Sequence, residues 1–152
     1  MALDINKCVK AATMPIVVLV VLGIIGLFAG IVPLLGVIAG LVLFLASLVV
    51  LAWAGFMAVK QHGMDLVGGA VTGVIAGVVS GIISGVISIV LYFLGIGATA
   101  AAMASMVGSG VTISGPVIII GLVIGLIIGT VFNAILGAIC GAVGAYVAQM
   151  KK

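Results

Sequence analysis

The stretch LVGGAVTGVIAGVVSGIISGVISIVLYFL (residues 66–94) repeats a glycine at every fourth position through much of its length. The register consists of Gly69, Gly73, Gly77, Gly81 and Gly85. Residues four apart lie on one face of an α-helix, so this spacing predicts a helix with one face reduced nearly to backbone. The neighbouring register is also built from small residues, whereas the remaining two carry mainly Val and Ile, which suit lipid or a bulky neighbouring helix.

A second glycine register lies near the end of the chain. It consists of Gly121, Gly125, Gly129, Gly137 and Gly141. Lipid tails are as apolar as leucine, so helices in a bilayer associate by close van der Waals contact, and small residues four apart let their backbones approach. The two registers therefore predict glycine zippers, which are seams where helices pack. The alternative is that one register lines or gates a pore.

The composition places the chain in a membrane. Hydrophobic residues make up 66% of it, charged residues only 5%, and the mean hydropathy is +1.73. A soluble domain carries about 25% charged residues, so this chain could not cover a globule with a wetted surface. Membrane lipid is therefore its first expected partner.

The same composition excludes most enzyme chemistry. The chain holds five Lys, two Asp and one His, and no Arg or Glu. Paired carboxylates for acid and base catalysis, clusters of metal ligands and an arginine clamp on phosphate all lack parts. We expect no catalytic residue, no cofactor and no bound metal. Without a basic stripe, we also expect no nucleic-acid partner.

The apolar runs predict an all-α fold with four transmembrane helices arranged as two hairpins. A helix needs about 20 apolar residues to cross the hydrocarbon core. The predicted spans are residues 14–30, 34–59, 66–94 and 117–150. They form a single domain between a leader (residues 1–13) and a tail (residues 151–152), and residues 95–116 form an outer loop that is either interfacial or re-entrant.

The charged residues predict the orientation. They fall in three places only, residues 4–10, 60–65 and 151–152. With four spans these places share one side of the membrane, and the positive-inside rule makes that side cytoplasmic. The chain is thus predicted to be a multi-pass protein of the cell membrane with both termini in the cytoplasm. Asp65 is placed to cap the third helix.

Five polar side chains inside the predicted spans are candidate site residues: Ser80, Ser84, Ser88, Thr130 and Asn133. Serine in such helices most often donates a hydrogen bond to the carbonyl four residues earlier. Asn133 is expected to join neighbouring helices through a hydrogen bond. The alternative for both is contact with a solute or an ion along a polar path.

The chain resembles small four-span membrane proteins rich in glycine zippers. The likeness rests on the composition and the glycine registers, and it implies no function. The sequence therefore supports two hypotheses. The first is a non-enzymatic structural or assembly role, as a homo-oligomer or an accessory subunit of a larger membrane complex. The second is a small-solute or ion pathway formed at an oligomer interface.

Overall fold

The structure is an all-α bundle. The computed structural model describes residues 4–29, 33–96 and 115–150, and 94% of them are helical. The helices are, in chain order, α1 (Ile5–Ala29), α2 (Pro33–His62), α3 (Leu66–Phe93) and α5 (Gly115–Met150). All four contain an apolar stretch long enough to cross a membrane. The prediction of a membrane protein with four transmembrane helices is therefore confirmed.

The first helix begins earlier than the sequence predicted. Most of the predicted leader, residues 1–13, is helical, because α1 starts at Ile5 and continues through Pro15. Asp4 begins this helix: its carboxylate accepts a hydrogen bond from the Lys7 backbone N–H at 3.4 Å. The polar residues of this segment thus extend the first span rather than precede it. Most of the predicted outer loop lies outside the described residues.

The ends of α3 explain the turns beside it. Asp65 is the predicted N-cap, and its Oδ1 accepts a hydrogen bond from the Gly68 N–H at 2.9 Å. Gly63 before it and Gly95 after the helix have φ angles of +64° and +71°, which favour glycine. The Gly95 N–H donates to the Tyr92 carbonyl at 3.0 Å, which closes the helix end.

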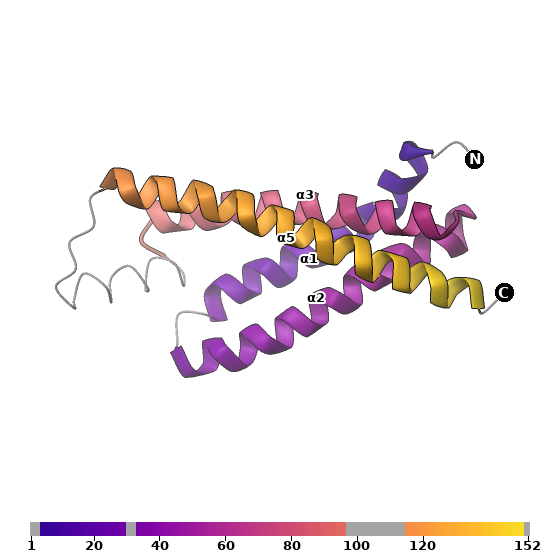
Figure 1. Ribbon diagram of the computed structural model, residues 1–152. Coiled ribbons are helices and arrows are strands. Elements are labelled where there is room, and N and C mark those ends of the chain that lie inside the picture. Colours follow the sequence, from indigo (N-terminus) through magenta and orange to yellow (C-terminus); the bar gives the residue numbers. More distant parts are fainter. Residues whose placement is uncertain (1–3, 30–32, 97–114, 151–152) are drawn as a thin grey trace.

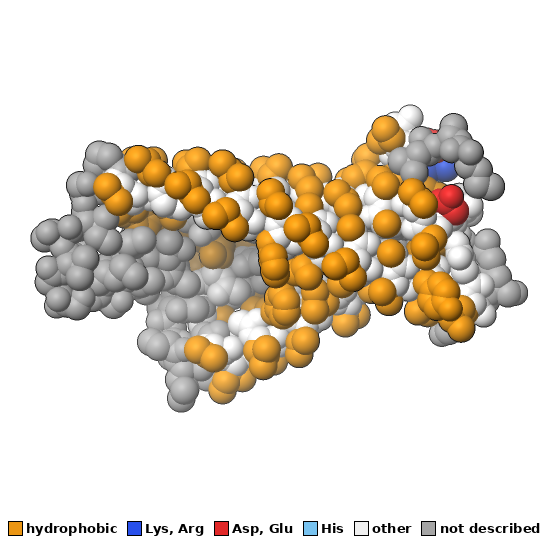
Figure 2. Space-filling view, in the orientation of Figure 1, with side chains coloured by type: hydrophobic (Ala, Val, Ile, Leu, Met, Phe, Trp, Pro, Cys, Tyr) orange, Lys and Arg blue, Asp and Glu red, His pale blue; other side chains and the backbone are white. Residues whose placement is uncertain are grey.

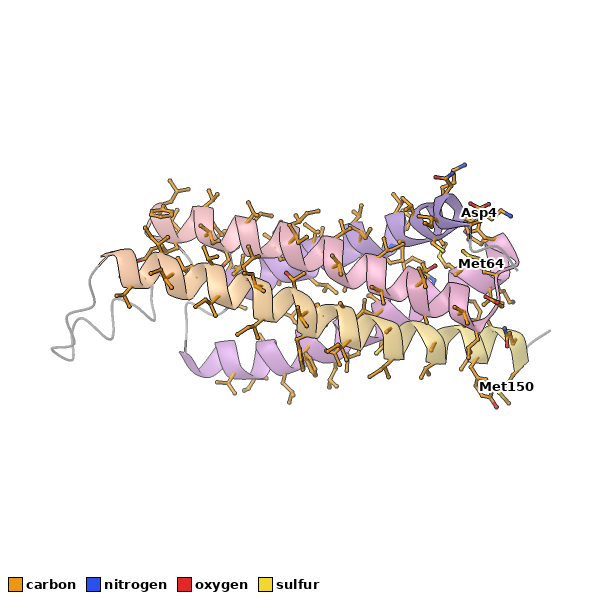
Figure 3. All side chains as sticks on the ribbon, turned by 45° about the horizontal axis from the view of Figure 1, so that its top comes forward. Asp4, Met64 and Met150 are labelled. Atoms are coloured by element: carbon orange, nitrogen blue, oxygen red, sulfur yellow. The ribbon has the colours of Figure 1, made fainter. Side chains whose placement is uncertain are left out.

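Both ends of the chain lie at the same end of the bundle, here called the termini end (Figure 1). The termini end contains the start of α1 and α3 and the end of α2 and α5. The acidic and basic side chains visible in Figure 2 lie there, and Asp4, Met64 and Met150 mark it in Figure 3. The charged residues that the structure describes thus share one end, as the sequence predicted. They are Asp4, Lys7, Lys10, Lys60 and Asp65.

Helix α2 packs closely against α5 at the termini end and separates from it toward the opposite end, whereas α3 and α5 stay together. In Figure 1, α2 meets α5 near the chain ends and lies far from it at the other end. The most extensive contact joins α3 and α5, whereas α1 packs against α2 and α3 and, within the described residues, does not reach α5. The buried core residues lie in the half nearest the termini, and most of them are alanine. They include Ala12, Leu19, Leu51, Ala54, Val59, Ala76, Ala145 and Ala148.

Glycine faces bring the backbones of α3 and α5 together in this half. A Cβ atom added at Gly73 would lie 2.9 Å from the Gly137 carbonyl carbon and 3.0 Å from the Gly141 Cα. A Cβ atom at Gly77 would lie 2.9 Å from the Asn133 carbonyl carbon. Real Cβ atoms do not approach other atoms so closely, so only glycine fits. We call this contact the inner seam; its residues are Gly69, Gly73, Gly77, Gly137 and Gly141.

Helix α2 joins the inner seam through two glycine contacts that the sequence analysis did not single out. A Cβ atom at Gly55 would lie 2.8 Å from the Gly141 Cα, and one at Gly144 would lie 2.6 Å from the Ala52 carbonyl carbon. Helices α2 and α3 therefore converge on the same stretch of α5. The outward faces of the helices expose branched side chains such as Ile127, Ile128 and Val131, which suit lipid.

The inner seam predicts that alanine substitution lowers the stability at one glycine of the α5 register but not at another. Gly137→Ala should lower the free energy of unfolding by about 1–3 kcal/mol, because the added methyl meets the Gly73 backbone. Gly129→Ala should not lower it, because nothing lies within 4 Å of a Cβ atom there and alanine favours helix. Thermal unfolding of both variants in one detergent measures the difference. Equal losses at the two positions would contradict the seam.

Candidate functional site

A cavity lies between the four helices in the half remote from the termini. Its volume is about 560 Å³, and every helix contributes to its wall. We call it the central cavity. Its polar lining residues are Ser47, Ser80, Ser84, Ser88, Thr130 and Asn133, and its larger apolar ones are Leu19, Leu22, Leu43, Phe44, Ile89, Leu122 and Leu126. All five polar side chains that the sequence singled out are thus brought together around one space.

Helix α3 contributes three hydroxyls along one face of the cavity. The Ser80 hydroxyl donates to the Ala76 carbonyl at 2.6 Å, which is the bond within the helix that the sequence predicted. Ser84 points toward α1, where its Oγ lies 2.7 Å from the place that a Cβ atom of Gly23 would occupy. The Ser84 hydroxyl has no hydrogen bond with any described residue. The absence of a side chain at Gly23 on α1 therefore leaves room for the Ser84 hydroxyl of α3.

Helix α5 contributes two polar groups at the end of the cavity nearest the inner seam, Thr130 and Asn133. The Thr130 Oγ1 atom is buried and has no hydrogen-bond partner among the described residues. The Asn133 amide nitrogen lies 3.2 Å from the position of a Cβ atom on Gly81. The Asn133 side chain makes no hydrogen bond within the described part of the chain. The predicted hydrogen bond from Asn133 to a neighbouring helix is therefore not found there.

The first half of the α5 glycine register lines the cavity instead of the inner seam. Nothing lies within 4 Å of a Cβ atom placed at Gly121, Gly125 or Gly129, and the same is true of Gly40 on α2. The glycines on α5 are exposed, which leaves the space open between α2 and α5. Figure 2 shows the hollow between these two helices. We call this opening the side opening.

The two remaining glycines of the α3 register, Gly81 and Gly85, line the cavity where α3 contacts α5. A Cβ atom at Gly85 would contact the Leu126 side chain, and one at Gly81 would lie 3.5 Å from the Thr130 Cα. The ten glycines singled out in the sequence thus divide between the inner seam and the cavity wall. Those at the cavity are Gly81, Gly85, Gly121, Gly125 and Gly129.

Short glycine pairs in the sequence include two cavity residues of α1 and α2, Gly26 and Gly40, but no pattern marked Gly23, Phe44 or Ser47. Ser47 is the only hydroxyl residue between residues 34 and 59, which is a signal that could have marked it. Its hydroxyl donates to the Phe44 carbonyl at 2.7 Å, so its oxygen remains an acceptor toward the cavity. Gly23 and Phe44 carry no such signal, because isolated glycines and phenylalanines are common in membrane helices.

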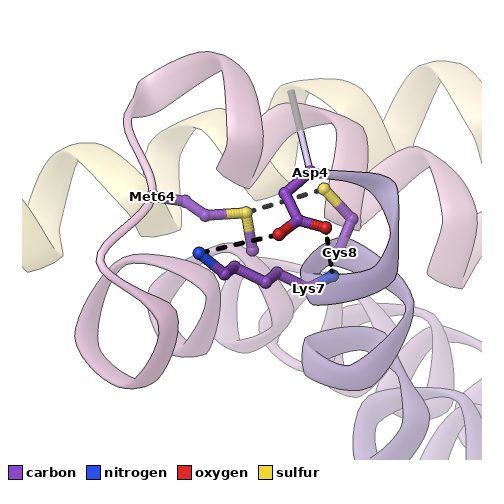
Figure 4. A network of polar contacts seen from close by, with 4 residues as sticks. All are labelled: Asp4, Lys7, Cys8 and Met64. Carbon is purple, nitrogen blue, oxygen red and sulfur yellow. Dashed lines mark hydrogen bonds and ion pairs between the residues drawn. The ribbon is translucent and has the colours of Figure 1, made fainter. Parts of the chain in front are cut away.

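A separate cluster of polar contacts lies at the termini end (Figure 4). Cys8 is fully buried, and its thiol donates a hydrogen bond to the Met64 sulfur at 3.6 Å. Asp4 and Lys7 form an exposed ion pair with an N to O distance of 3.6 Å. Cys8 and Cys140 are both free thiols. Within the described residues, no three His, Cys, Asp or Glu side chains gather as metal ligands would.

Comparisons with known proteins found no similarity. No protein-family model matches the chain, and neither a curated protein nor a solved structure matches it.

Proposed function

We propose that this chain is a non-enzymatic membrane protein whose central cavity receives a small uncharged molecule as part of a solute pathway. The observation that carries the proposal is the set of polar groups without partners: the Thr130 Oγ1, the Ser84 hydroxyl and the Asn133 amide. A polar group left without a hydrogen bond in hydrocarbon costs several kcal/mol. Water or a polar molecule in the cavity would supply the missing partners.

The chemistry of the lining favours an uncharged molecule over an ion. The lining residues are hydroxyls, one amide, glycines and apolar side chains, without a formal charge. A desolvated charge is stable only beside an opposite charge or a dense set of ligands. The inner seam blocks the cavity toward the termini end, so passage through the whole membrane would require α2, α3 and α5 to move apart.

The proposal predicts that a thiol in the cavity reacts with a small reagent from water. In a background with Cys8 and Cys140 replaced by alanine, Ser84→Cys should react with methyl methanethiosulfonate, because a hydrated thiol can ionise. Thr72→Cys is the matched control, since it belongs to the same small-residue register of α3 and Thr72 is 0% exposed. Mass spectrometry of the protein in lipid vesicles gives both rates.

Ser84→Cys should react at least about tenfold faster than Thr72→Cys, because the control thiol must wait for local opening of the helix bundle. Ile83→Cys, on the neighbouring lipid-facing register, should also stay slow. An unreactive Ser84→Cys in a folded protein would contradict the proposed function.

Assembly is a second candidate function, supported by the open glycines of α5. We propose that Gly121, Gly125 and Gly129 form a glycine zipper with a helix of another subunit, while the inner seam is the zipper within one chain. Small faces without a partner favour association of membrane helices. Such a partner, in a homo-oligomer or a larger complex, would cover the side opening. The two candidate functions therefore compete for one surface.

Assembly predicts a specific cross-link between copies of this chain. Gly125→Cys in the cysteine-free background should form a disulfide-linked dimer in oxidised membranes, because two such faces would meet at the interface. Ile127→Cys is the control: it lies two residues further on α5, on the opposite face, and is 58% exposed. Equal cross-linking at the two positions, or none at Gly125, would contradict a homo-oligomer built on this face.

We propose that the termini end faces the cytoplasm of the cell, because the described lysines gather there. The measurement is labelling of intact cells by a thiol reagent that cannot cross the membrane. Leu94→Cys, at the far end of α3 and 64% exposed, should react. Gln61→Cys, at the termini end, should react only after the cells are opened. The reverse result would invert the orientation.

A further inference from the structure

We propose that the molecule received by the central cavity is an uncharged amphiphile that enters from the bilayer through the side opening. Its hydrogen-bonding end would lie against Ser84, Thr130 and Asn133, and its apolar part would extend along the leucine and phenylalanine walls. This inference rests on the proposed function and adds to it the chemical class of the ligand and its route.

The route follows from where the cavity is open. The α5 wall at Gly121, Gly125 and Gly129 is exposed and has no side chain against it, and the opposite wall at Gly40 is equally open. Both faces beside the opening carry exposed apolar side chains such as Leu41 and Val123. An opening framed by such residues along two membrane-spanning helices leads to lipid. A molecule dissolved in the bilayer can therefore reach the cavity directly.

The orientation of the ligand follows from how the polar groups are distributed along the cavity. Ser47, Ser80, Thr130 and Asn133 lie at the end nearest the inner seam. Toward the other end the wall changes to Gly26, Gly40, Ile89, Gly121 and Leu122, with Ser88 as the polar group of that region. The α5 wall from Gly121 to Asn133 is about 18 Å long at 1.5 Å per residue. One end thus suits a polar head and the rest suits a chain or ring.

The chemical class of the ligand's head group follows from the cavity side chains that have hydrogen-bonding capacity left over. The Asn133 amide offers two donors and one acceptor, and the hydroxyls of Thr130 and Ser84 each offer a donor and acceptors. None of these groups is used within the described residues. An alcohol or a ketone matches this set, whereas a carboxylate or an ammonium group would be buried without an opposite charge. The volume of about 560 Å³ lies within the range of small-molecule sites, roughly 300–1,000 Å³.

A single tryptophan in the cavity can report the ligand. Trp53 is the only tryptophan of the chain. In a Trp53→Phe background, Phe44→Trp places the reporter on the cavity wall, and Phe132→Trp places it on the lipid-facing side of α5, where Phe132 is 55% exposed. Both variants are reconstituted in phosphatidylcholine vesicles. The probes are bromododecanol, which has the predicted head group, and bromododecane, which lacks it; bromine quenches nearby tryptophan fluorescence.

Bromododecanol should quench the Phe44→Trp reporter saturably. Its half-quenching mole fraction should be at least about fivefold lower than that of bromododecane, the factor expected for one hydrogen bond. Asn133→Leu, which keeps the branched shape of the side chain but removes the amide, should abolish this preference. The Phe132→Trp reporter should respond to both probes alike and without saturation. Bromododecanol, but not bromododecane, should also slow thiol labelling of Ser84→Cys, a second readout that needs no tryptophan in the cavity.

Equal quenching of the Phe44→Trp reporter by the two probes would overturn the proposal that the cavity binds an amphiphile. A preference for bromododecanol that survives Asn133→Leu would overturn it as well. If Ser84→Cys still reacts with methyl methanethiosulfonate in that case, the cavity takes up small polar molecules and only the ligand class is wrong. If Ser84→Cys is also unreactive, the proposed function fails together with the inference.

Discussion

The rest of the structure depends on the direct contact between the α3 and α5 backbones at the inner seam. Lipid gives helices no hydrophobic reason to associate, so attraction must come from atoms in close contact. Gly73 and Gly137 face each other so closely that neither has room for a Cβ atom. The contact also restricts the register between the two helices, because a shift that placed Val74 at the position of Gly73 would bring a branched side chain against the Gly137 backbone.

The close contact in one half has a consequence in the other. Helices that touch backbone to backbone and cross at an angle separate as they leave the contact. Helix α2 follows α5 at Gly55 and Gly144 and then diverges from it, as Figure 1 shows. Beyond Asn133 the same glycine register that packs at Gly137 faces open space at Gly129. The cavity thus opens where α2 diverges from α5, while α3 and α5 stay in contact at Gly85 and Leu126.

The sequence predicted the number of helices and most of their ends, because hydrocarbon thickness and capping residues act locally. Asp65 is an example, since it caps α3 by accepting a hydrogen bond from the Gly68 N–H three residues further on. The cavity could not be predicted in the same way. Gly129 and Gly137 belong to one register and look alike in sequence, but a Cβ atom at Gly137 would meet the α3 backbone, whereas one at Gly129 would meet nothing within 4 Å. Ser47 and Gly23 line the cavity from α2 and α1, which are distant in the chain from α5. Such long-range geometry leaves no periodic signal in the sequence.

The polar groups of the cavity distinguish between the two occupants proposed for the side opening. A helix of a second subunit would cover Gly121, Gly125 and Gly129, and its close contacts would stabilise the complex. It would leave the Thr130 Oγ1 and the Asn133 amide unsatisfied unless it carried a polar side chain at the matching depth. A molecule with a hydroxyl or carbonyl end satisfies these groups directly and fills the apolar remainder of the cavity. Because an unsatisfied polar group in hydrocarbon costs several kcal/mol, the lining favours a ligand with a head group over an apolar helix.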